Sequence, residues 1–109
     1  MRPGVRLSRP LVLEVPVRLA DGAGGFVPGW EVRGTLWAEV VARRGREGAG
    51  VARASYRITV RAAPQGAPSR PLAGQRLRDG ARLFAIAAVT ESAAGPGYLT
   101  LWAEEEVGA

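Results

Sequence analysis

Residues 53–61 read Arg-Ala-Ser-Tyr-Arg-Ile-Thr-Val-Arg, and this stretch decides the fold of the 109-residue chain. The even-numbered positions hold Ala, Tyr, Ile and Val, whereas the odd-numbered positions hold Arg, Ser, Arg, Thr and Arg. A period of two is that of a β-strand, in which successive side chains point to opposite faces of the sheet. We therefore predict a strand with one buried apolar face and one basic, solvent-facing side.

Related patterns lie on both sides of this strand. Further strands are expected at residues 11–19 (LVLEVPVRL), 35–42 (TLWAEVVA), 76–78, 81–89 and 98–104. Asp79-Gly80 is a strong hairpin signal between two of them. Pro16 cannot donate a backbone hydrogen bond to a neighbouring strand, which predicts an edge or a bulge there. No segment has convincing helical spacing, although residues 44–52 could form a short helical turn.

These strands predict an all-β fold, a small antiparallel β-barrel or sandwich of about five to six strands with long loops. One domain is expected over residues 1–109, with residues 1–6 and 105–109 as flexible or assembly-contacting tails. The expected core consists of Leu13, Val15, Val17, Leu36, Val40, Tyr56, Ile58, Val60, Leu83, Ile86, Leu99 and Leu101.

Residues 21–30 (DGAGGFVPGW) form the densest glycine cluster. A dinucleotide-binding loop would need glycine where Val27 stands, and a Walker loop needs a lysine, which this chain lacks altogether. The cluster is therefore interpreted as a turn between strands, with Phe26 and Trp30 closing over the sheet. Positive φ angles are expected at Gly22, Gly24 and Gly25.

The composition leaves few groups for catalysis. The chain has no cysteine and no histidine, so it lacks thiolate chemistry, the commonest general base and the commonest metal ligand. Its carboxylates are scattered, and no pair has a spacing that demands joint acid–base work. We expect no catalytic, cofactor or metal site, so a small hydrolase is a weak alternative. No apolar run approaches the roughly 20 residues of a membrane helix, and no membrane partner is expected.

Charge is distributed unevenly. The net charge is +5; all fifteen arginines lie within residues 1–82, and residues 83–109 hold only acidic charges. Such a chain could attract nucleic acid or stack on a partner of complementary charge. Arg53, Arg57 and Arg61 form a basic stripe on one strand, so an OB-like nucleic-acid-binding module is an alternative. The aromatic residues are expected in the core or in subunit interfaces rather than among the arginines.

Several motifs together resemble a known family. They are the turn DGAGGF at residues 21–26, the strand TLWAEV at 35–40, the segment ITVR at 58–61, LFAIAAV at 83–89 and YLTLWAEE at 98–105. In this order they resemble the head–tail joining proteins of tailed bacteriophages, also called head completion or stopper proteins. The resemblance covers residues 7–106. The arginine-rich, lysine-free composition suits a prophage or a gene transfer agent of a GC-rich bacterium.

The resemblance implies a structural, non-enzymatic protein of a virion or phage-like particle, assembled in the bacterial cytoplasm. It implies a hexameric ring between a portal-side adaptor protein and the tail terminator or tail tube protein, around packaged DNA that is contacted without sequence specificity. The long loop at residues 43–53 is expected to line or gate the channel, through Arg43, Arg44, Arg46 and Arg53. Candidate assembly-interface residues are Trp30, Trp37, Glu39, Glu104, Glu105 and Glu106.

Overall fold

The computed structural model describes residues 4–43, 46–48, 51–92 and 94–107, apart from the side chains of residues 46–48, 51–52 and 107. Its strands are β1 (Arg9–Ala20), β2 (Phe26–Ala42), β3 (Arg46–Gly48), β4 (Val51–Arg61), β5 (Arg76–Asp79), β6 (Arg82–Glu91) and β7 (Tyr98–Val107). No helix in the described ranges is long and apolar enough to cross a membrane.

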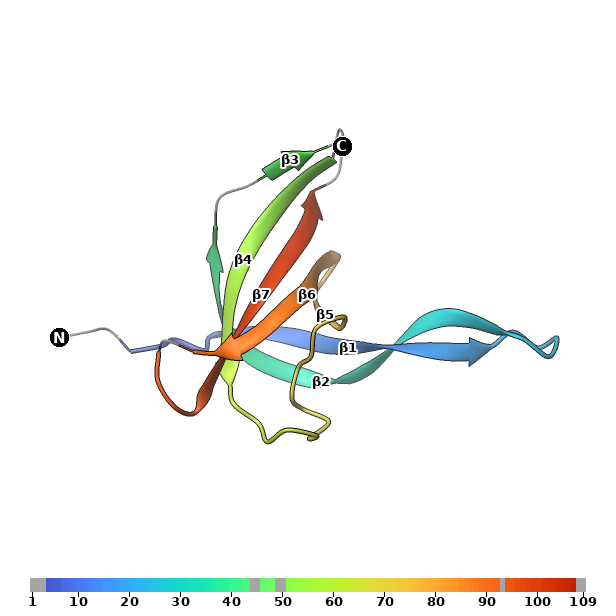
Figure 1. Cartoon of the computed structure of the whole chain (residues 1–109), viewed down its shortest axis with the longest axis horizontal. Coiled ribbons are helices and arrows are strands. Elements are labelled where there is room, and N and C mark those ends of the chain that lie inside the picture. Colours follow the sequence, from blue (N-terminus) through green and yellow to red (C-terminus); the bar gives the residue numbers. More distant parts are fainter. Residues whose placement is uncertain (1–3, 44–45, 49–50, 93, 108–109) are drawn as a thin grey trace.

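All neighbouring strands are antiparallel, in the order β2-β1-β5-β6-β7-β4-β3. Strand β2 also pairs with β4, through Ala38 to Ala42, so six strands form a closed circuit of hydrogen-bonded neighbours (Figure 1). Strand β3 pairs with the N-terminal end of β4, outside this closed sheet. The predicted all-β antiparallel fold is confirmed.

Strand β4 is the central element, as its alternating sequence predicts. It pairs with β7 along ten residue positions and with β2 on its other edge. Ile58 and Val60 are fully buried, whereas Arg57 and Arg61 are exposed on the opposite face. The predicted inward apolar face of this strand is therefore confirmed at Ile58 and Val60, whereas the predicted solvent-facing side is wrong at Thr59, which is only 4% exposed.

Most of the expected core residues are buried or pack against the buried cluster, but two positions are wrong. Val17 is only half-buried and lies in the part of β1 that extends beyond its pairing with β5. Leu83 is 39% exposed, and its neighbour Phe84 is fully buried and makes an edge-to-face contact with Tyr56. The run at residues 83–89 is apolar on both faces, so its sequence does not reveal which face turns inward. Buried apolar residues absent from the expected list are Leu11, Ala38, Pro71, Leu77, Phe84 and Ala103.

Two irregularities in strand pairing change which residues face the interior. In β6 the register shifts between Ile86 and Ala88, so Ala87 is an extra residue and Val89 packs against the core. In β2 an extra residue, Arg33, lies opposite the step from Leu13 to Glu14 in β1. A β-bulge of this kind inverts the inward and outward alternation beyond it.

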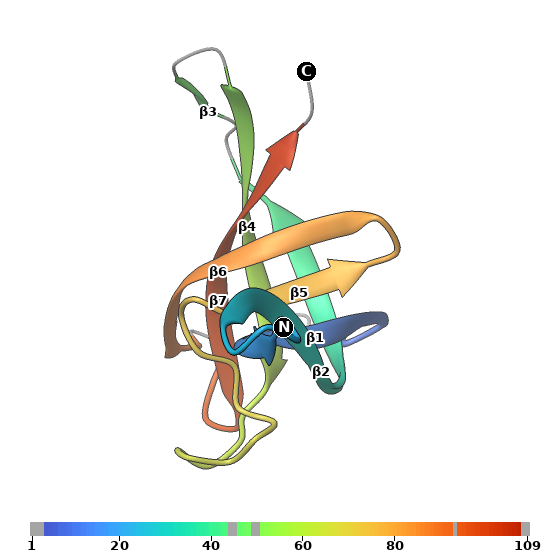
Figure 2. The same ribbon diagram turned by 90° about the vertical axis from the view of Figure 1, so that its right-hand side faces the viewer.

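Strands β1 and β2 continue well past the closed sheet as a two-stranded ribbon (Figure 1). The molecule measures 60 × 37 × 22 Å, and its radius of gyration of 15.3 Å exceeds the roughly 13 Å expected of a compact chain of this length. Pro16 lies in this ribbon, where β1 has β2 as its one strand partner, so the predicted edge position is confirmed. In Figure 2 the ribbon points toward the viewer.

The glycine cluster is the turn at the tip of this ribbon. Gly22 and Gly24 have positive φ angles, as expected, but Gly25 does not. Its backbone N–H donates to Oδ1 of Asp21, which also accepts a hydrogen bond from Ala23. Strand β2 begins directly after the turn, nine residues earlier than predicted, and the expectation that Phe26 closes over the sheet is wrong because this side chain is 58% exposed.

The segment expected to form a helical turn is instead a hairpin. Arg46 of β3 pairs with Arg53 of β4, and Gly48 pairs with Val51. Residues 44, 45, 49 and 50 lie outside the described residues. Figures 1 and 2 show this β3–β4 hairpin projecting from the closed sheet, away from the direction of the β1–β2 ribbon.

Replacing Ile58 by Asp tests the inward face of β4. Burial of such a side chain contributes about 1.5–3 kcal/mol, and an unpaired carboxylate in its place adds a desolvation cost. We expect Ile58→Asp to abolish cooperative thermal unfolding in circular dichroism. Arg57→Asp, on the exposed face of the same strand, should stay folded, and a folded Ile58→Asp protein would contradict the assignment.

Candidate assembly surfaces

The ribbon leaves the closed sheet beside a buried carboxylate. Glu14 of β1 is 7% exposed and accepts hydrogen bonds from Nε of Arg76 and Nε of Arg78, at 2.7 and 2.9 Å. Both arginines lie on β5, the neighbour of β1 at this point. The Arg76 guanidinium also lies 4.0 Å from the centre of the Trp30 ring, so this cluster connects β5 to both strands of the ribbon.

This cluster changes the acidity of Glu14. Burial favours the neutral acid and by itself raises the pKa, but hydrogen bonds and charges from Arg76 and Arg78 outweigh it. The net effect holds the pKa of Glu14 below its usual range. The carboxylate therefore remains ionised in the folded protein at mildly acidic pH.

A second cluster joins β4, β6 and β7. Both carboxylate oxygens of Glu105 accept hydrogen bonds from Arg82, and Oε1 also accepts one from the Tyr56 hydroxyl. The hydrogen bond from Arg82 is the main cause that lowers the pKa of Glu105. Burial and the nearby Glu105 carboxylate raise the pKa of Tyr56.

The acidic residues proposed for assembly thus differ in what they contact. Glu105 is largely buried in the cluster with Arg82, and Glu104 lies 3.7 Å from Arg53. Glu106 is exposed. All three belong to β7, which runs to Val107, and the charge available to a partner is smaller than the sequence suggests.

The expectation that the aromatic residues lie apart from the arginines is wrong. Besides Trp30 with Arg76, Arg18 stacks on Phe26 at 4.7 Å and Arg43 on Trp102 at 4.8 Å. Arg18 and Phe26 lie on either side of one turn, but strand pairing brings the other two pairs together from positions that are distant in sequence. Arg43 and Trp102, for example, belong to segments that flank β4 on opposite sides.

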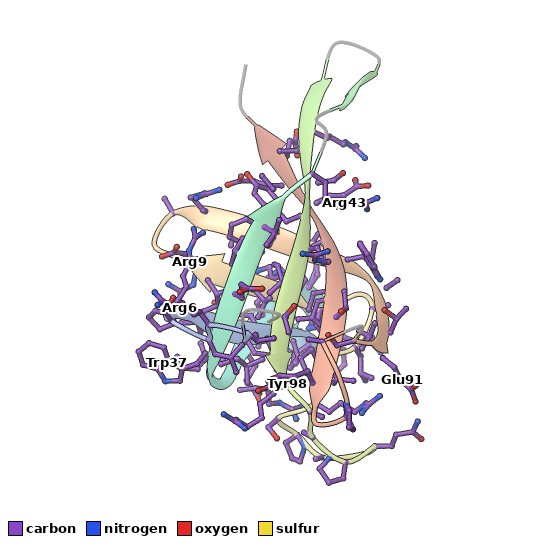
Figure 3. All side chains as sticks on the ribbon, turned by 90° about the vertical axis from the view of Figure 1, so that its left-hand side faces the viewer. Arg6, Arg9, Trp37, Arg43, Glu91 and Tyr98 are labelled. Carbon is purple, nitrogen blue, oxygen red and sulfur yellow. The ribbon has the colours of Figure 1, made fainter. Side chains whose placement is uncertain are left out.

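The expected channel residues lie at or near the projecting β3–β4 hairpin. Arg43 follows the end of β2, and Arg53 is exposed in β4. Arg44 and the side chain of Arg46 lie outside the described residues. Figure 3 shows Arg43 near the base of the hairpin, above the closed sheet.

The remaining candidate interface residues all belong to β2 but lie in different parts of it. Trp30 is in the ribbon and is 42% exposed, whereas Trp37 lies where β2 re-enters the closed sheet and is 56% exposed. Glu39 is half-buried, and its Oε2 accepts the backbone N–H of Arg6. Trp37 points outward from β2 in Figure 3.

The same sheet face holds a depression of about 690 Å³. Its walls include Glu39, Arg57, Thr59 and Tyr98, together with the N-terminal residues 4–6. Among the described residues, no group of three or more acidic, cysteine or histidine side chains could hold a metal ion. The lining residues do not form a general acid–base pair or a nucleophile with its base.

Known proteins resemble the chain along its whole length. The family model for phage head completion proteins matches residues 1–106. A solved chain from the virion of a native gene transfer agent particle is 48% identical, with a TM-score of 0.82. The alignment covers 99% of this chain and 100% of that chain. No curated protein matches.

Acid titration tests the Glu14 cluster. Because the folded pKa of Glu14 is depressed, its stabilising effect is present above the unfolded pKa of about 4.3 and is lost as pH falls through the folded value. Glu14→Gln should lower the unfolding free energy at pH 7 by about 1–3 kcal/mol. The difference from wild type should shrink below about pH 4.

Urea unfolding at a series of pH values measures this difference. Glu91→Gln is the matched control, because Glu91 is exposed and its carboxylate makes no ion pair within the described residues. A Glu14→Gln deficit that stays constant down to pH 3 would show that the ionised carboxylate is not what the two arginines stabilise.

Proposed function

The chain belongs to the family of phage head completion proteins, and from this premise we propose that it is a non-enzymatic connector of a phage-like particle. In this proposal, copies of the chain form a ring, with six copies as the expected number. The ring lies between the portal-side adaptor protein and the tail terminator or tail tube protein. It surrounds the channel through which DNA leaves the head.

The observation that carries this proposal is the full-length similarity to a chain of the gene transfer agent virion. The identity is 48%, and the alignment covers 99% of this chain, so it spans the closed sheet as well as the segments that project from it. This supports a role as a particle component for the chain as a whole. The same match favours a gene transfer agent or related particle over an OB-like nucleic-acid-binding module.

The shape of the chain supports a connecting role. Two extensions leave the closed sheet in different directions, and the main core cluster lies in the closed part, with Val15 buried at the base of the ribbon. Elements that project without adding to a core are well suited to contact neighbouring molecules. We assign the contacts of the connector to these extensions and to the exposed face of β2.

The β3–β4 hairpin is the proposed channel element. Arg43 and Arg53 place positive charge near its base, Arg46 of β3 pairs with Arg53, and the sequence adds Arg44 next to Arg43. Arginines near packaged DNA would act on phosphates, without reading base sequence. The carboxylate of Glu104 near Arg53 moderates this charge on one side of the hairpin.

Removal of the protein tests the connector role directly. Particle-producing cells that lack this chain should yield DNA-filled or leaking heads without attached tails, and supplying the protein should restore joined particles in electron micrographs. Normal joined particles in its absence would contradict the proposal. Tight, salt-sensitive DNA binding by the isolated protein, together with absence from particles, would instead support the OB-like alternative.

Neutralising the hairpin tests the channel role. We expect Arg43→Ser, Arg44→Ser and Arg46→Ser combined to leave tail joining intact but to reduce retained DNA, measured as nuclease-protected DNA per particle. The matched control replaces the same three arginines by lysine, which keeps the charge and should retain DNA. Equal retention in the serine and wild-type particles would exclude a phosphate-contacting role for the hairpin.

A further inference from the structure

The β1–β2 ribbon carries an unusual amount of exposed apolar surface. We define the arm as residues 15–20 of β1 and 26–32 of β2, with the turn that joins them. Five large apolar side chains of the arm are substantially exposed: Leu19, Phe26, Val27, Trp30 and Val32. Scattered single residues of this kind are normal on a protein surface, but here they are contiguous along one ribbon.

These side chains occupy both faces of the arm. Directly paired residues of an antiparallel ribbon share a face. Leu19 pairs with Val27, and the next pair, Ala20 with Phe26, lies on the opposite face. Each strand of the arm also has one edge without a strand partner, because β5 pairs only with Val12–Glu14 of β1, and β4 pairs only with β2 from Ala38 onward.

A ribbon of this construction is poorly stabilised in isolation. A two-stranded hairpin is at best marginally stable in water, and a further strand or a packing surface is needed to hold it. The Glu14–Arg76–Trp30 cluster secures only the base of the arm. The outer part therefore combines exposed apolar side chains with unpaired strand edges, as in surfaces that become covered when a partner binds.

A complementary surface exists on the same chain. Trp37, Glu39 and Val41 alternate along β2 and point outward, while Leu36, Ala38 and Val40 point to the core. Trp37 and Val41 are exposed and flank the half-buried Glu39. We call these three outward residues the β2 stripe.

The charges of the arm and the stripe match. Arg18 stacks on Phe26 in the arm and makes no ion pair among the described residues. Glu39 likewise makes no ion pair within the described part of the chain, and one of its two oxygens accepts the backbone N–H of Arg6. The arm thus carries one guanidinium, that of Arg18, beside apolar side chains. The stripe carries one carboxylate, that of Glu39, between two apolar side chains.

The two surfaces lie at opposite ends of the molecule. Figure 1 places the tip of the arm at one end of the long axis and the C-terminal half of β2 at the other, and Figure 3 shows Trp37 from that second end. Six extended residues of the arm span about 20 Å, similar to the 22 Å thickness of the molecule. An arm can therefore reach across the sheet face of a neighbour, while its own stripe is out of reach.

We propose that the arm of one copy docks on the β2 stripe of the next copy, with Arg18 against Glu39 and with Phe26 and Trp30, the exposed aromatic residues on the Arg18 face of the arm, against Trp37 and Val41. Contacts between two different patches repeat from copy to copy and close into a ring when the rotation allows. This inference rests on the proposed ring and names the surfaces that join its subunits. Docking on a second copy would also bury the apolar side chains that the arm exposes in the single chain.

Crosslinking in assembled particles tests the contact. The natural chain has no cysteine, so thiols can be introduced without background. Particles are produced with Ala20→Cys in the arm, on the face that carries Arg18 and Phe26, and Val41→Cys in the stripe. Both positions are exposed, and the particles are treated with a short bismaleimide crosslinker. The double variant should give a ladder of covalent multimers of this chain in denaturing gels, whereas each single variant should stay monomeric.

A charge exchange provides an independent measurement. In purified protein at concentrations where copies associate, or in competition for incorporation into particles, Arg18→Glu and Glu39→Arg alone should each weaken assembly by about tenfold or more, because like charges then meet. The combination of both changes in one chain should restore it. Arg70→Glu and Glu91→Arg, singly and combined, control for net charge, because neither residue belongs to the arm or the stripe.

The outcomes separate this inference from the proposed function. If the chain is present in joined particles but the double-cysteine variant gives no ladder, the arm does not dock on a second copy and the connector role stands. Crosslinks from the arm to a different particle protein would assign the arm to that protein and overturn the inference. If the chain is absent from particles altogether, the proposed function fails, and the inference fails with it.

Discussion

Closure of the sheet through the pairing of β2 with β4 is the constraint on which the rest of the structure depends. Ile58 and Val60 lie in the strand that joins β2 to β7, so their burial requires that both neighbours be in place. Without this pairing, β4 would be an edge strand, and one side of the core would be open to water. In this pairing the C-terminal end of β2 lies against β4. The N-terminal half of β2 is therefore left to follow β1 outward.

The arm follows from a mismatch in strand lengths. Strand β5 has four residues, whereas β1 has twelve and β2 has seventeen, so the closed sheet cannot accommodate β1 and β2 along their whole length. The bulge opposite Leu13 and Glu14 lies where the two strands leave the sheet. Glu14 and its two arginines hold this exit point with charged hydrogen bonds that are largely shielded from water. The ion pairs of Glu14 fix the base of the arm. The exposed apolar side chains farther out give the arm a surface suited to binding.

The arginines do more than contribute to the net charge. Several stack on aromatic rings, and others bind buried carboxylates, since a planar guanidinium can do both at once. Arg76 does so between Glu14 and Trp30, and Arg82 between Glu105 and the rings of Tyr56 and Phe84. A count of charges along the sequence therefore overstates the charge that a partner such as DNA would meet. The same holds for the two described side chains of the expected channel segment, since Arg43 stacks on Trp102 and Arg53 lies near the Glu104 carboxylate.

The sequence by itself determined the all-β class, most of the strands, the inward face of β4 and the family, because alternation and turn residues are local properties of the chain. It also identified Trp30, Trp37 and Glu39 as candidate contacts, whose roles remain predictions. It missed β3 and the N-terminal half of β2. It did not determine whether Leu83 or Phe84 turns inward, since a run that is apolar on both faces carries no alternation. The exposure of Phe26 and the pairing of Arg76 with Trp30 were decided by tertiary structure alone. Both depend on where β1 and β2 leave the closed sheet, and that point is set by long-range strand pairing and a bulge, which local sequence does not encode.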